Sequence, residues 1–432
     1  MADQDETRPR RRRRMTAMVA VGVLVVVAGA CGEDTDSSSS DTTVVGSGEQ
    51  ADLLGPENAA AGEPVRVGFV TDGATAAFDT RDETRAAQAT VEYWNAYRGG
   101  VGGRPIELVT CETGGDPAGG TDCGNSLVSD DVVAVVFGTS AVAEQAWGPL
   151  HDAGVPTMLF QATAENMNRD PDSTFLLVNP LPTLFGLPIS VAQRADADKV
   201  AFVVIDVPVA VNAFEADGPD ILDNAGLDYQ LVRVPPGTAD MTVQMQQLVD
   251  DGAGVVHILG NDTFCIAALQ GLAAAAYEGE IVAVSQCITD ATRQAIPGED
   301  LEGISIISGS ALGAADDPTY QLYEAVMGAY GDDVTDPESN VSMGAYTVMG
   351  ALATALQGMS GDITPETVTA AVKAMPEQEL PGGGGVMYRC GGSAMSSQPA
   401  VCTNQWLRAV LDTDGRPASY EVEDSSDVVG DL

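Results

Sequence analysis

The sequence predicts an α/β protein of two lobes, each a doubly wound sheet of mainly parallel strands with helices on both faces. Three observations predict this fold class. Short apolar runs rich in β-branched residues alternate with segments of helical spacing between residues 65 and 285. The alternation breaks at the two prolines of residues 175–182 and then restarts. The chain of 432 residues is long enough to bury two separate cores.

The first half of the pattern predicts four strands with helices between them. A strand at residues 65–71 precedes a helix that runs to about residue 97. Tyr93 and Trp94 fall at helical spacing on that helix, which is more typical of a core than of a ligand contact. The remaining elements are strands at residues 105–111, 131–137 and 155–160, with helices near residue 126 and up to residue 152.

The second half repeats the alternation without repeating the residues. The expected strands are 199–205, 229–234, 254–260, 281–285 and 304–308, and the expected helices are 211–225, 238–250, 265–277, 318–330 and 341–357. The prolines at 175–182 and the small residues at 309–315 are candidate crossings between lobes. We therefore assign residues 63–179 and 313–380 to lobe 1, and residues 180–312 and 381–432 to lobe 2, joined by a hinge.

The first 30 residues have the pattern of a secretory signal peptide. Six arginines between residues 8 and 14 precede an apolar run, 15–29, that is too short for a transmembrane helix, which needs about 20 residues. Small residues then lead to Cys31. This ending resembles a bacterial lipobox, which implies cleavage before Cys31 and lipidation of its sulfur. An ordinary signal peptide ending near a cysteine is the alternative. Residues 31–62 are acidic and rich in Ser, which predicts a disordered tether.

The net charge of −43, from 63 acidic and 20 basic residues, excludes nucleic acid and anionic membrane surfaces as partners. Solubility outside the cell explains the charge, and attraction of a cationic solute is compatible with it but not required. The six cysteines after Cys31 fall into three local pairs, and an even count in an exported chain favours disulfides. The pairs are Cys111 with Cys123, Cys265 with Cys287, and Cys390 with Cys402. Without close Cys or His spacing, neither a metal site nor a cofactor is predicted.

The turn after the strand at 131–137 is the strongest candidate for a binding site. That strand is almost wholly apolar, as expected of a strand covered on both faces. Gly138 permits a tight turn, and Thr139 or Ser140 can cap a new helix. Backbone N–H groups at the start of such a helix point beyond the strand, where open α/β sheets bind ligands.

Four segments resemble the extracellular solute receptors of the Leu/Ile/Val-binding type. They are EYWNAYRGGVGGRPIEL at 92–108, GVPT at 154–157, VPPGTAD at 234–240 and SMGAY at 342–346. Single motifs are weak, but their order and spacing cover about residues 63–412. The resemblance implies a type I periplasmic-binding-protein fold that delivers a small polar solute to an ABC importer. An amino acid, branched-chain or related, or an amide is the expected solute.

The same resemblance implies contacts to the ligand from the first lobe. In the family, turns like 138–140 and 161–163 hold the ligand carboxylate by backbone N–H and hydroxyl groups, and an aromatic residue near position 78 covers it. The positions concerned are Phe78, Gly138, Thr139, Ser140, Gln161, Ala162 and Thr163. Simple helix capping by Ser140 or Thr163, and a loop anchor at Phe78, are the alternatives.

The second lobe departs from the family pattern. Amino-acid receptors of this type carry an acidic residue after the strand at 281–285, and this chain has Gln286 there. Asn261 and Asp262 replace an expected aromatic residue. We hypothesise that Asp262 supplies the missing negative charge, or that the ligand lacks an α-ammonium group. Asp262 as a plain N-cap is the alternative. A Cys265–Cys287 bridge would join the two second-lobe loops beside the pocket.

No catalytic residues are predicted, and the protein is not expected to be an enzyme. His151 and His257 are the two histidines, and neither falls in a recognisable arrangement with a nucleophile. The expected partners are a small-molecule solute and an importer permease, with membrane contact through the lipid anchor only, on the outer face of the cell membrane, and the chain is expected to be a monomer. A ligand sensor of the same fold that feeds a membrane receptor or kinase is the alternative function.

Overall fold

The computed structural model describes residues 52–75, 79–162, 164–178 and 182–424. The predicted signal peptide, Cys31 and most of the predicted tether lie outside the described residues. Residues 46–432 form one compact unit. Within the described part of the chain, no helix combines the length and the hydropathy that a membrane span requires.

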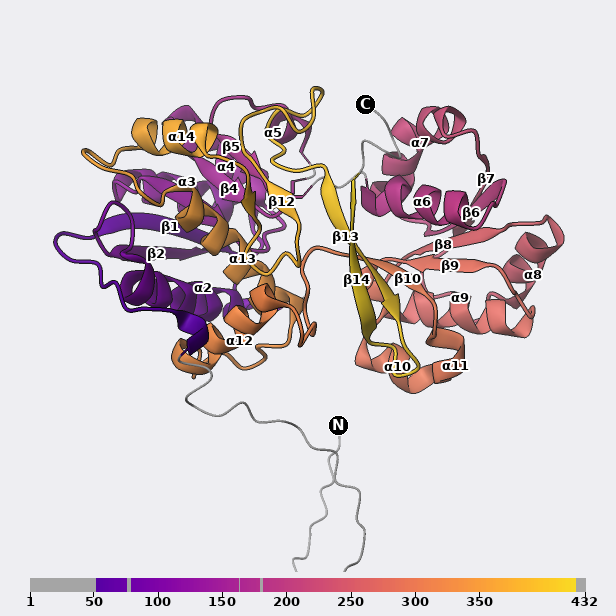
Figure 1. The fold of residues 1–432 in the computed structure, drawn as a ribbon. Helices are drawn as coiled ribbons and strands as arrows, with labels where there is room; N and C mark the ends of the chain where they lie inside the picture. The colour runs from indigo at the N-terminus through magenta and orange to yellow at the C-terminus, as the bar shows by residue number, and fades with distance from the viewer. Residues whose placement is uncertain (1–51, 76–78, 163, 179–181, 425–432) are drawn as a thin grey trace, which may run out of the picture. The chain divides into compact units, whose positions relative to one another are not determined.

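The first sheet has five parallel strands in the order β2-β1-β3-β4-β5 (Figure 1). The strands are β1 (Val65–Thr71), β2 (Ile106–Glu112), β3 (Ala134–Phe137), β4 (Thr157–Leu159) and β5 (Thr174–Leu176). Alternate residues of β3 enter two different cores: Ala134 and Val136 pack in one, and Val135 and Phe137 in the other. Both faces of the sheet are therefore buried, as the apolar run predicted.

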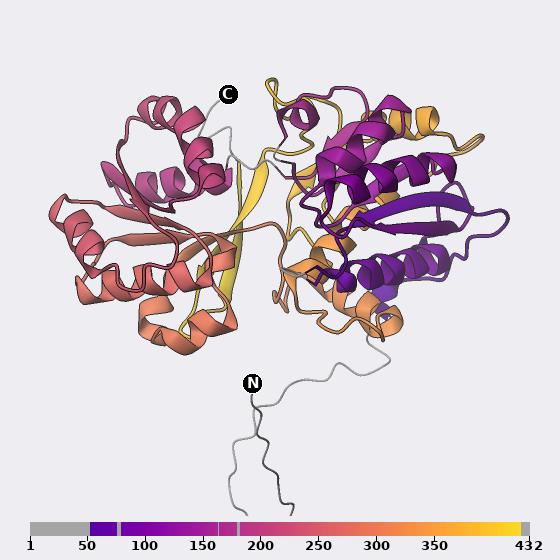
Figure 2. The same ribbon diagram turned by 180° about the vertical axis from the view of Figure 1, so that it is seen from behind.

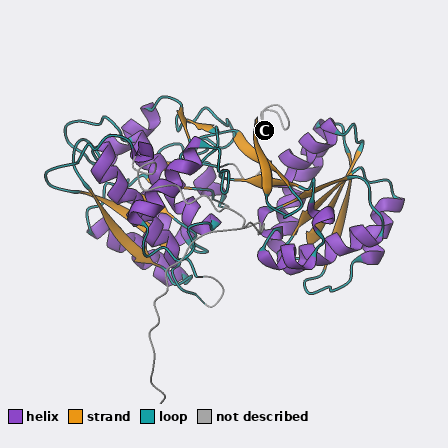
Figure 3. Ribbon diagram, turned by 60° about the horizontal axis from the view of Figure 1, so that its bottom comes forward, coloured by secondary structure: helices purple, strands orange, loops and turns teal. Residues whose placement is uncertain are grey.

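Helices cover the first sheet on its two faces (Figure 3). The core that contains Ala134 also includes residues of α2 (Arg81–Tyr93), α12 (Pro318–Tyr330), α13 (Asn340–Ala355) and α14 (Pro365–Ala374). The core that contains Val135 includes residues of α3 (Pro117–Ser129), α4 (Ala143–Asp152) and α5 (Glu165–Asn168). Because helices lie on both faces, the first lobe is doubly wound.

The helix expected to continue to about residue 97 changes character on the way. The α-helical part, α2, ends at Tyr93, and a π-helical turn, η1 (Trp94–Arg98), follows it. Gly99, with a φ of 76°, then ends the helix. Tyr93 and Trp94 are 2% and 7% exposed, so both are core residues, as predicted.

The second sheet has seven strands in the order β14-β13-β10-β9-β8-β6-β7. Its strands are β6 (Lys199–Ile205), β7 (Asp228–Val234), β8 (Val255–Leu259), β9 (Glu280–Ala283), β10 (Ser305–Ser308), β13 (Gln405–Leu411) and β14 (Pro417–Asp424). The five strands from β6 to β10 are parallel, and the two C-terminal strands add an antiparallel edge. The parallel part confirms the predicted βα alternation.

One core cluster, separate from those of the first sheet, lies around the second sheet. The helical segments of this lobe, seen from behind in Figure 2, are η2 (Pro182–Gly186), α6 (Leu187–Arg194), α7 (Pro208–Asn224), α8 (Thr242–Asp250), α9 (Asp262–Ala274), η3 (Ser285–Cys287), α10 (Asp290–Ala295) and α11 (Gly298–Leu301). The prediction of an α/β protein with two sheets and two sets of cores is confirmed.

Part of the range assigned to lobe 2 packs with the first sheet. A small antiparallel pair, β11 (Gln378–Glu379) and β12 (Met387–Tyr388), precedes the crossing to β13. Tyr388 and Cys390 are buried in the core of α2 and α13, and Val401 is buried in the core of α3 and α4. Val401 also forms a parallel bridge with Leu176, at the edge of the first sheet. The crossing therefore comes after Cys402 rather than at residue 381.

The three predicted cysteine pairs are joined as disulfides. Cys111–Cys123 joins β2 to α3, and Cys265–Cys287 joins α9 to η3. Cys390–Cys402 closes the loop between β12 and β13. Each bridge closes a short loop, with a sequence separation of 12, 22 and 12 residues.

Candidate ligand-binding cavity

The largest of the described cavities has a volume of about 660 Å³. It lies beyond the carboxyl ends of β3 and β4. Three other segments also line it: η3 with the residues after it, the loop after β10, and the first turns of α13. Polar side chains come from each direction, among them Ser140, Gln161, Gln286, Ser310 and Asn340. Its size is within the range of about 300–1,000 Å³ that small-molecule sites occupy.

The buried carboxylate of Glu83, on α2, accepts hydrogen bonds from the turn after β3. The backbone N–H of Thr139 donates to both oxygens of the Glu83 carboxylate, at 2.8 and 2.9 Å, and the Thr139 hydroxyl donates to it at 2.6 Å. Thr71, the last residue of β1, donates its hydroxyl to the same carboxylate at 2.5 Å. Glu83 is 3% exposed, yet it contributes to the cavity lining.

Gly138 is required at this turn for a reason that the sequence did not predict. Its φ is not positive, so left-handed backbone geometry is not the cause. A Cβ atom on Gly138 would lie 2.4 Å from the Glu83 Oε2 atom and 3.0 Å from the Phe69 ring. The glycine is therefore needed because the Glu83 carboxylate approaches the backbone closely.

A second buried carboxylate, Asp72, holds the next part of the turn. It accepts hydrogen bonds from the Ser140 hydroxyl at 2.9 Å, the Ala141 N–H at 2.8 Å and the Thr113 hydroxyl at 2.5 Å. Asp72 is 6% exposed and follows β1 directly. The donors of Thr139, Ser140 and Ala141 that face these two carboxylates are thus already bonded within the protein.

The prediction that Thr139 or Ser140 caps the next helix is wrong. The helix α4 begins at Ala143, its N-cap residue is Val142, and no side chain makes the capping bond. The two hydroxyls instead donate to Glu83 and Asp72. The hydroxyls bond to these carboxylates rather than to the helix end because leaving a buried carboxylate without donors costs more free energy than leaving an exposed helix end uncapped.

Burial raises the pKa of Glu83 above its ordinary value of 4.5, and hydrogen bonds from Thr139 and Thr71 oppose that rise. A raised pKa means that the folded state binds this proton more tightly than the unfolded state does. The resulting contribution to stability is complete below pH 4.5 and is lost as the pH rises through the pKa of the folded protein.

Two of the predicted first-lobe contacts besides the 138–140 turn are in the cavity wall. Gln161 and Ala162 line the cavity just after β4, as expected from the strand-end rule. Phe78 and Thr163 lie outside the described residues. Phe160, which was not predicted as a contact, also lines the cavity and lies against Gly309, where an added Cβ would be 2.1 Å from its ring.

In the second lobe, Gln286 lines the cavity and the other two predicted contacts serve helix α9. Asn261 is the N-cap of α9 and accepts a hydrogen bond from the Phe264 N–H at 3.0 Å. The cap is therefore Asn261, not Asp262 as the alternative interpretation had it. Asp262 begins the helix, and its carboxylate accepts from the Thr263 N–H at 2.7 Å. Among the described lining residues neither Asn261 nor Asp262 occurs, so their role in binding stays a prediction.

The wall around Gln286 is held by a covalent bond and a helix cap. The Cys265–Cys287 disulfide connects the residue next to Gln286 to helix α9. Two residues after Cys287, Thr289 is the N-cap of α10 and forms a capping box with Thr292. Thr289 also lines the cavity. The predicted Cys265–Cys287 bridge is therefore present, and it joins α9 to η3.

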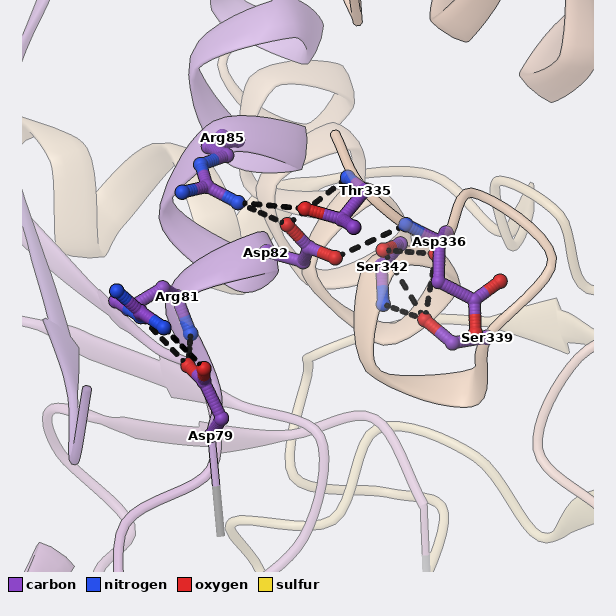
Figure 4. Close-up of polar contacts among 8 residues, drawn as sticks. All are labelled: Asp79, Arg81, Asp82, Arg85, Thr335, Asp336, Ser339 and Ser342. Carbon is purple, nitrogen blue, oxygen red and sulfur yellow. Dashed lines mark hydrogen bonds and ion pairs between the residues drawn. The ribbon is translucent and has the colours of Figure 1, made fainter. Parts of the chain in front are cut away.

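Sequence reasoning missed the contribution of α13, whose Asn340, Val341 and Gly344 line the cavity. The contacts that place its first turn are drawn in Figure 4. Asp82 of α2 accepts the N–H groups of Thr335 and Asp336 at 3.1 and 3.0 Å. The Ser339 hydroxyl then caps α13 by accepting the Ser342 N–H at 3.2 Å.

The same close-up shows which acidic residues near the start of α2 have a cation beside them. Arg85 pairs with Asp82 at 2.6 Å, and Arg81 pairs with Asp79 (Figure 4). The salt bridges of the described residues include none to Asp72 or Glu83. Asp72 could have been noticed in the sequence, because it is an acid directly after a strand. Nothing in the sequence distinguished the buried Glu83 from the nearby acids Asp79 and Asp82.

Both histidines have structural surroundings, as predicted. The His151 ring stacks on Trp147 with centroids 4.4 Å apart and shares a hydrogen bond of 3.1 Å with the Ser173 hydroxyl. His257 is fully buried in β8, with a ring nitrogen 3.3 Å from the Val282 carbonyl oxygen. In the described part of the chain, no three His, Cys, Asp or Glu residues are grouped so that they could hold a metal ion.

Two sheets of mainly parallel strands, and a cavity at the carboxyl ends of β3 and β4, are the features of an α/β binding protein. The sequence profile of the periplasmic binding proteins matches residues 64–401, and the chain belongs to this family. The members are binding proteins, which agrees with the expectation that the chain is not an enzyme. A sequence comparison with curated proteins finds no match.

Solved structures of similar fold share little sequence with this chain. An ABC transporter substrate-binding protein from Sphaerobacter thermophilus has a TM-score of 0.65 at 17% identity, covering 86% of this chain and 100% of that one. The branched-chain amino acid transporter substrate-binding protein LivJ from Streptococcus pneumoniae, in complex with isoleucine, has a TM-score of 0.62 at 16% identity, with coverages of 84% and 100%. A fatty acid ABC transporter substrate-binding protein from Thermomonospora curvata has a TM-score of 0.58 at 18% identity, with coverages of 85% and 94%. These likenesses confirm the type I periplasmic-binding-protein fold.

Proposed function

We propose that this protein is an extracellular solute-binding protein that captures a small polar solute in the 660 Å³ cavity and delivers it to an ABC importer. The observation that carries the proposal is the position of the cavity, at the carboxyl ends of β3 and β4 and beside Gln286 of the other sheet's lobe, in a chain of the periplasmic-binding-protein family. Among the similar solved structures, one is in complex with isoleucine, and another is a fatty acid transporter's substrate-binding protein. Family membership alone therefore does not select the chemistry of the solute.

A thermal-shift screen of small metabolites tests the proposal. The protein would be used from residue 32 onward, without the predicted signal peptide and Cys31. A solute that binds the folded state at a hundred times its Kd stabilises that state by about 2.7 kcal/mol, which raises the melting temperature measurably. Substitution of Gln161 by Ala, in the first-lobe wall, should weaken the same shift. A broad screen with no stabilising solute would contradict the proposal.

We propose Ser140, Gln161, Ala162 and Gln286 as ligand contacts, since all four line the cavity. Asp262 has less support than these four residues, because it is not among the described lining residues and its carboxylate accepts the Thr263 N–H of its own helix. Titration of an amine-bearing ligand against Asp262→Asn decides its role. Unchanged affinity would remove Asp262 from the site, whereas a loss of about ten-fold or more would retain it.

We also propose that lipidation at Cys31 anchors the protein to the outer face of the cell membrane. The support is the order of arginines, apolar run and small residues before Cys31, followed by an acidic, Ser-rich stretch. A Cys31→Ala variant should leave the membrane fraction and appear as free protein, since its anchor would be lost. Mass spectrometry of the wild type checks the modification directly, and an unmodified mature N-terminus other than Cys31 would contradict it.

A further inference from the structure

We infer that the solute in this cavity carries no carboxylate at the 138–141 turn: it is a neutral or cationic small molecule, such as an amide or an amine, rather than a free amino acid. The inference rests on the proposed function, because it names the chemical class of the solute for the same cavity. Three sets of observations support it: the bonded state of the turn, the charge of the lining, and the groups that remain open to a ligand.

The turn that would hold a ligand carboxylate already holds two carboxylates of the protein. The Thr139 N–H and hydroxyl donate to Glu83, and the Ser140 hydroxyl and Ala141 N–H donate to Asp72. The Gly138 N–H is also engaged, at 2.9 Å from the Val70 carbonyl oxygen. A ligand carboxylate that took these donors would have to displace side chains that are 3% and 6% exposed and leave them buried without donors.

The charge of the cavity opposes an anion independently of those bonds. Its described lining contains two acidic residues, Glu83 and Glu144, and no Lys, Arg or His. Asp72 lies directly behind the turn, and the ion pairs of the described residues include none to Asp72 or to Glu83. A ligand carboxylate in these negatively charged surroundings would be repelled, whereas a ligand ammonium or amidinium group would be attracted.

The groups that remain suit a solute of neutral or positive polar character. Gln161 and Gln286 each offer an amide that both donates and accepts hydrogen bonds, and Asn340 offers a third. Phe160 and Ile288 provide apolar surface for a hydrocarbon part. Because Gln286 carries a neutral amide, no carboxylate is present at that position of the second wall to select an α-ammonium group.

Matched ligand pairs that differ in a carboxylate test the inference by isothermal titration calorimetry. The probes are leucine and leucinamide, phenylalanine and phenylalaninamide, arginine and agmatine, and glycine betaine and choline. We expect binding by carboxylate-free members, each at least about ten-fold tighter than its carboxylate partner. Any carboxylate member that binds as tightly as its partner overturns the inference and leaves the proposed solute-binding function standing. Failure of all eight probes also counts against the inference, while the broad metabolite screen decides the proposed function separately.

Charge-neutral variants connect the selectivity to the two carboxylates. The double variant Asp72→Asn, Glu83→Gln keeps the shape of both side chains, so the discrimination against carboxylates should fall by about ten-fold or more. Glu302→Gln, an exposed acid away from the cavity, is the matched control and should leave the discrimination unchanged. Unaltered selectivity in a folded double variant would overturn the role of the two carboxylates.

A second variant protects the test against misfolding of the first. Glu144 lines the cavity but is exposed on α4, so Glu144→Gln should fold normally. This substitution should weaken the binding of agmatine or choline, whichever the wild type binds, by several-fold. Stronger binding of the cation in Glu144→Gln would contradict a negative cavity.

Discussion

The cavity has two walls that are held in place by different physical means. The first wall, residues 138–141, is fixed by hydrogen bonds to the buried carboxylates of Asp72 and Glu83. The second wall, residues 285–289, is fixed by the Cys265–Cys287 disulfide and by the capping box of α10. The first wall therefore carries negative charge and responds to pH, whereas the second is neutral and responds to loss of a covalent bond. We therefore expect the first wall to determine which ligand charge is accepted, and the second wall to depend on its disulfide for its conformation.

The largest effect is expected from opening the covalent link in the second wall. The disulfide closes a separation of 22 residues. Cys265→Ser with Cys287→Ser should lower the free energy of unfolding by about 3 kcal/mol, because the unfolded chain gains freedom. Urea denaturation measures the loss, and hydrogen exchange of residues 285–289 should become faster.

The Cys111–Cys123 disulfide offers a control of the same chemistry away from the second wall, with a separation of 12 residues. Its double Ser variant should lose about 3 kcal/mol as well. Exchange at residues 285–289 should stay as in the wild type. Equal acceleration of exchange in both variants would show that the second wall does not depend on its own bridge.

The next effect comes from adding one methyl group to the first wall. Gly138→Ala places a Cβ 2.4 Å from the Glu83 carboxylate, so that carboxylate must move away from Thr139. We expect a loss of about 2 kcal/mol in the free energy of unfolding, as for other overpacked sites. Denaturant titration measures it.

Gly148 is the matched control for that substitution, because it lies in α4 with no atom within 4 Å of an added Cβ. Gly148→Ala should be neutral or stabilise by about 0.5–1 kcal/mol, since alanine restricts the unfolded chain. If both alanine variants behaved alike, close approach of Glu83 would not be the reason for Gly138.

A smaller effect is expected at the helix cap of the second wall. Thr289→Ala removes the side-chain acceptor for the Thr292 N–H and should cost about 1 kcal/mol. Thr364→Ala removes the same kind of capping box from α14, outside the cavity. Both variants should lose similar stability in thermal melts. Only Thr289→Ala should also weaken solute binding, and equal affinities would exclude Thr289 from the site.

The smallest effect is a dependence on pH that belongs to the first wall. Burial raises the pKa of Glu83 above 4.5, so this residue stabilises the fold less as the pH rises from 4.5 through that pKa. Glu83→Gln cannot titrate, and its stability relative to the wild type should therefore improve over the same rise in pH. Chemical denaturation at a series of pH values measures this difference. A constant difference in stability between Glu83→Gln and the wild type over this pH range would contradict the assignment.

Local patterns in the sequence were sufficient to predict the fold and several residues of the cavity lining. Apolar runs rich in β-branched residues predict strands, helical spacing predicts helices, and their alternation implies parallel sheets. Residues 138–140, 161–162 and 286 follow strands, and strand ends in such sheets face the ligand. The cysteines pair with near neighbours, which sequence separation alone favours.

Tertiary structure decided how those positions are used. Glu83 is 56 residues from Thr139 along the chain, and Asp72 is 69 residues from Ala141. Contacts over such distances depend on how helices and strands pack, so no local pattern predicts that two carboxylates take the donors of the turn. The position of α13 is likewise set by a long-range contact, because Asp82 accepts a hydrogen bond from the Asp336 N–H just before this helix. Tyr388 and Val401 are also placed by packing, since both are buried in the cores of the first sheet. The sequence by itself predicted which strand ends line the cavity, because strand ends are local features. Packing decided the charge that this ligand meets, because the charge comes from side chains that only the folded chain brings together.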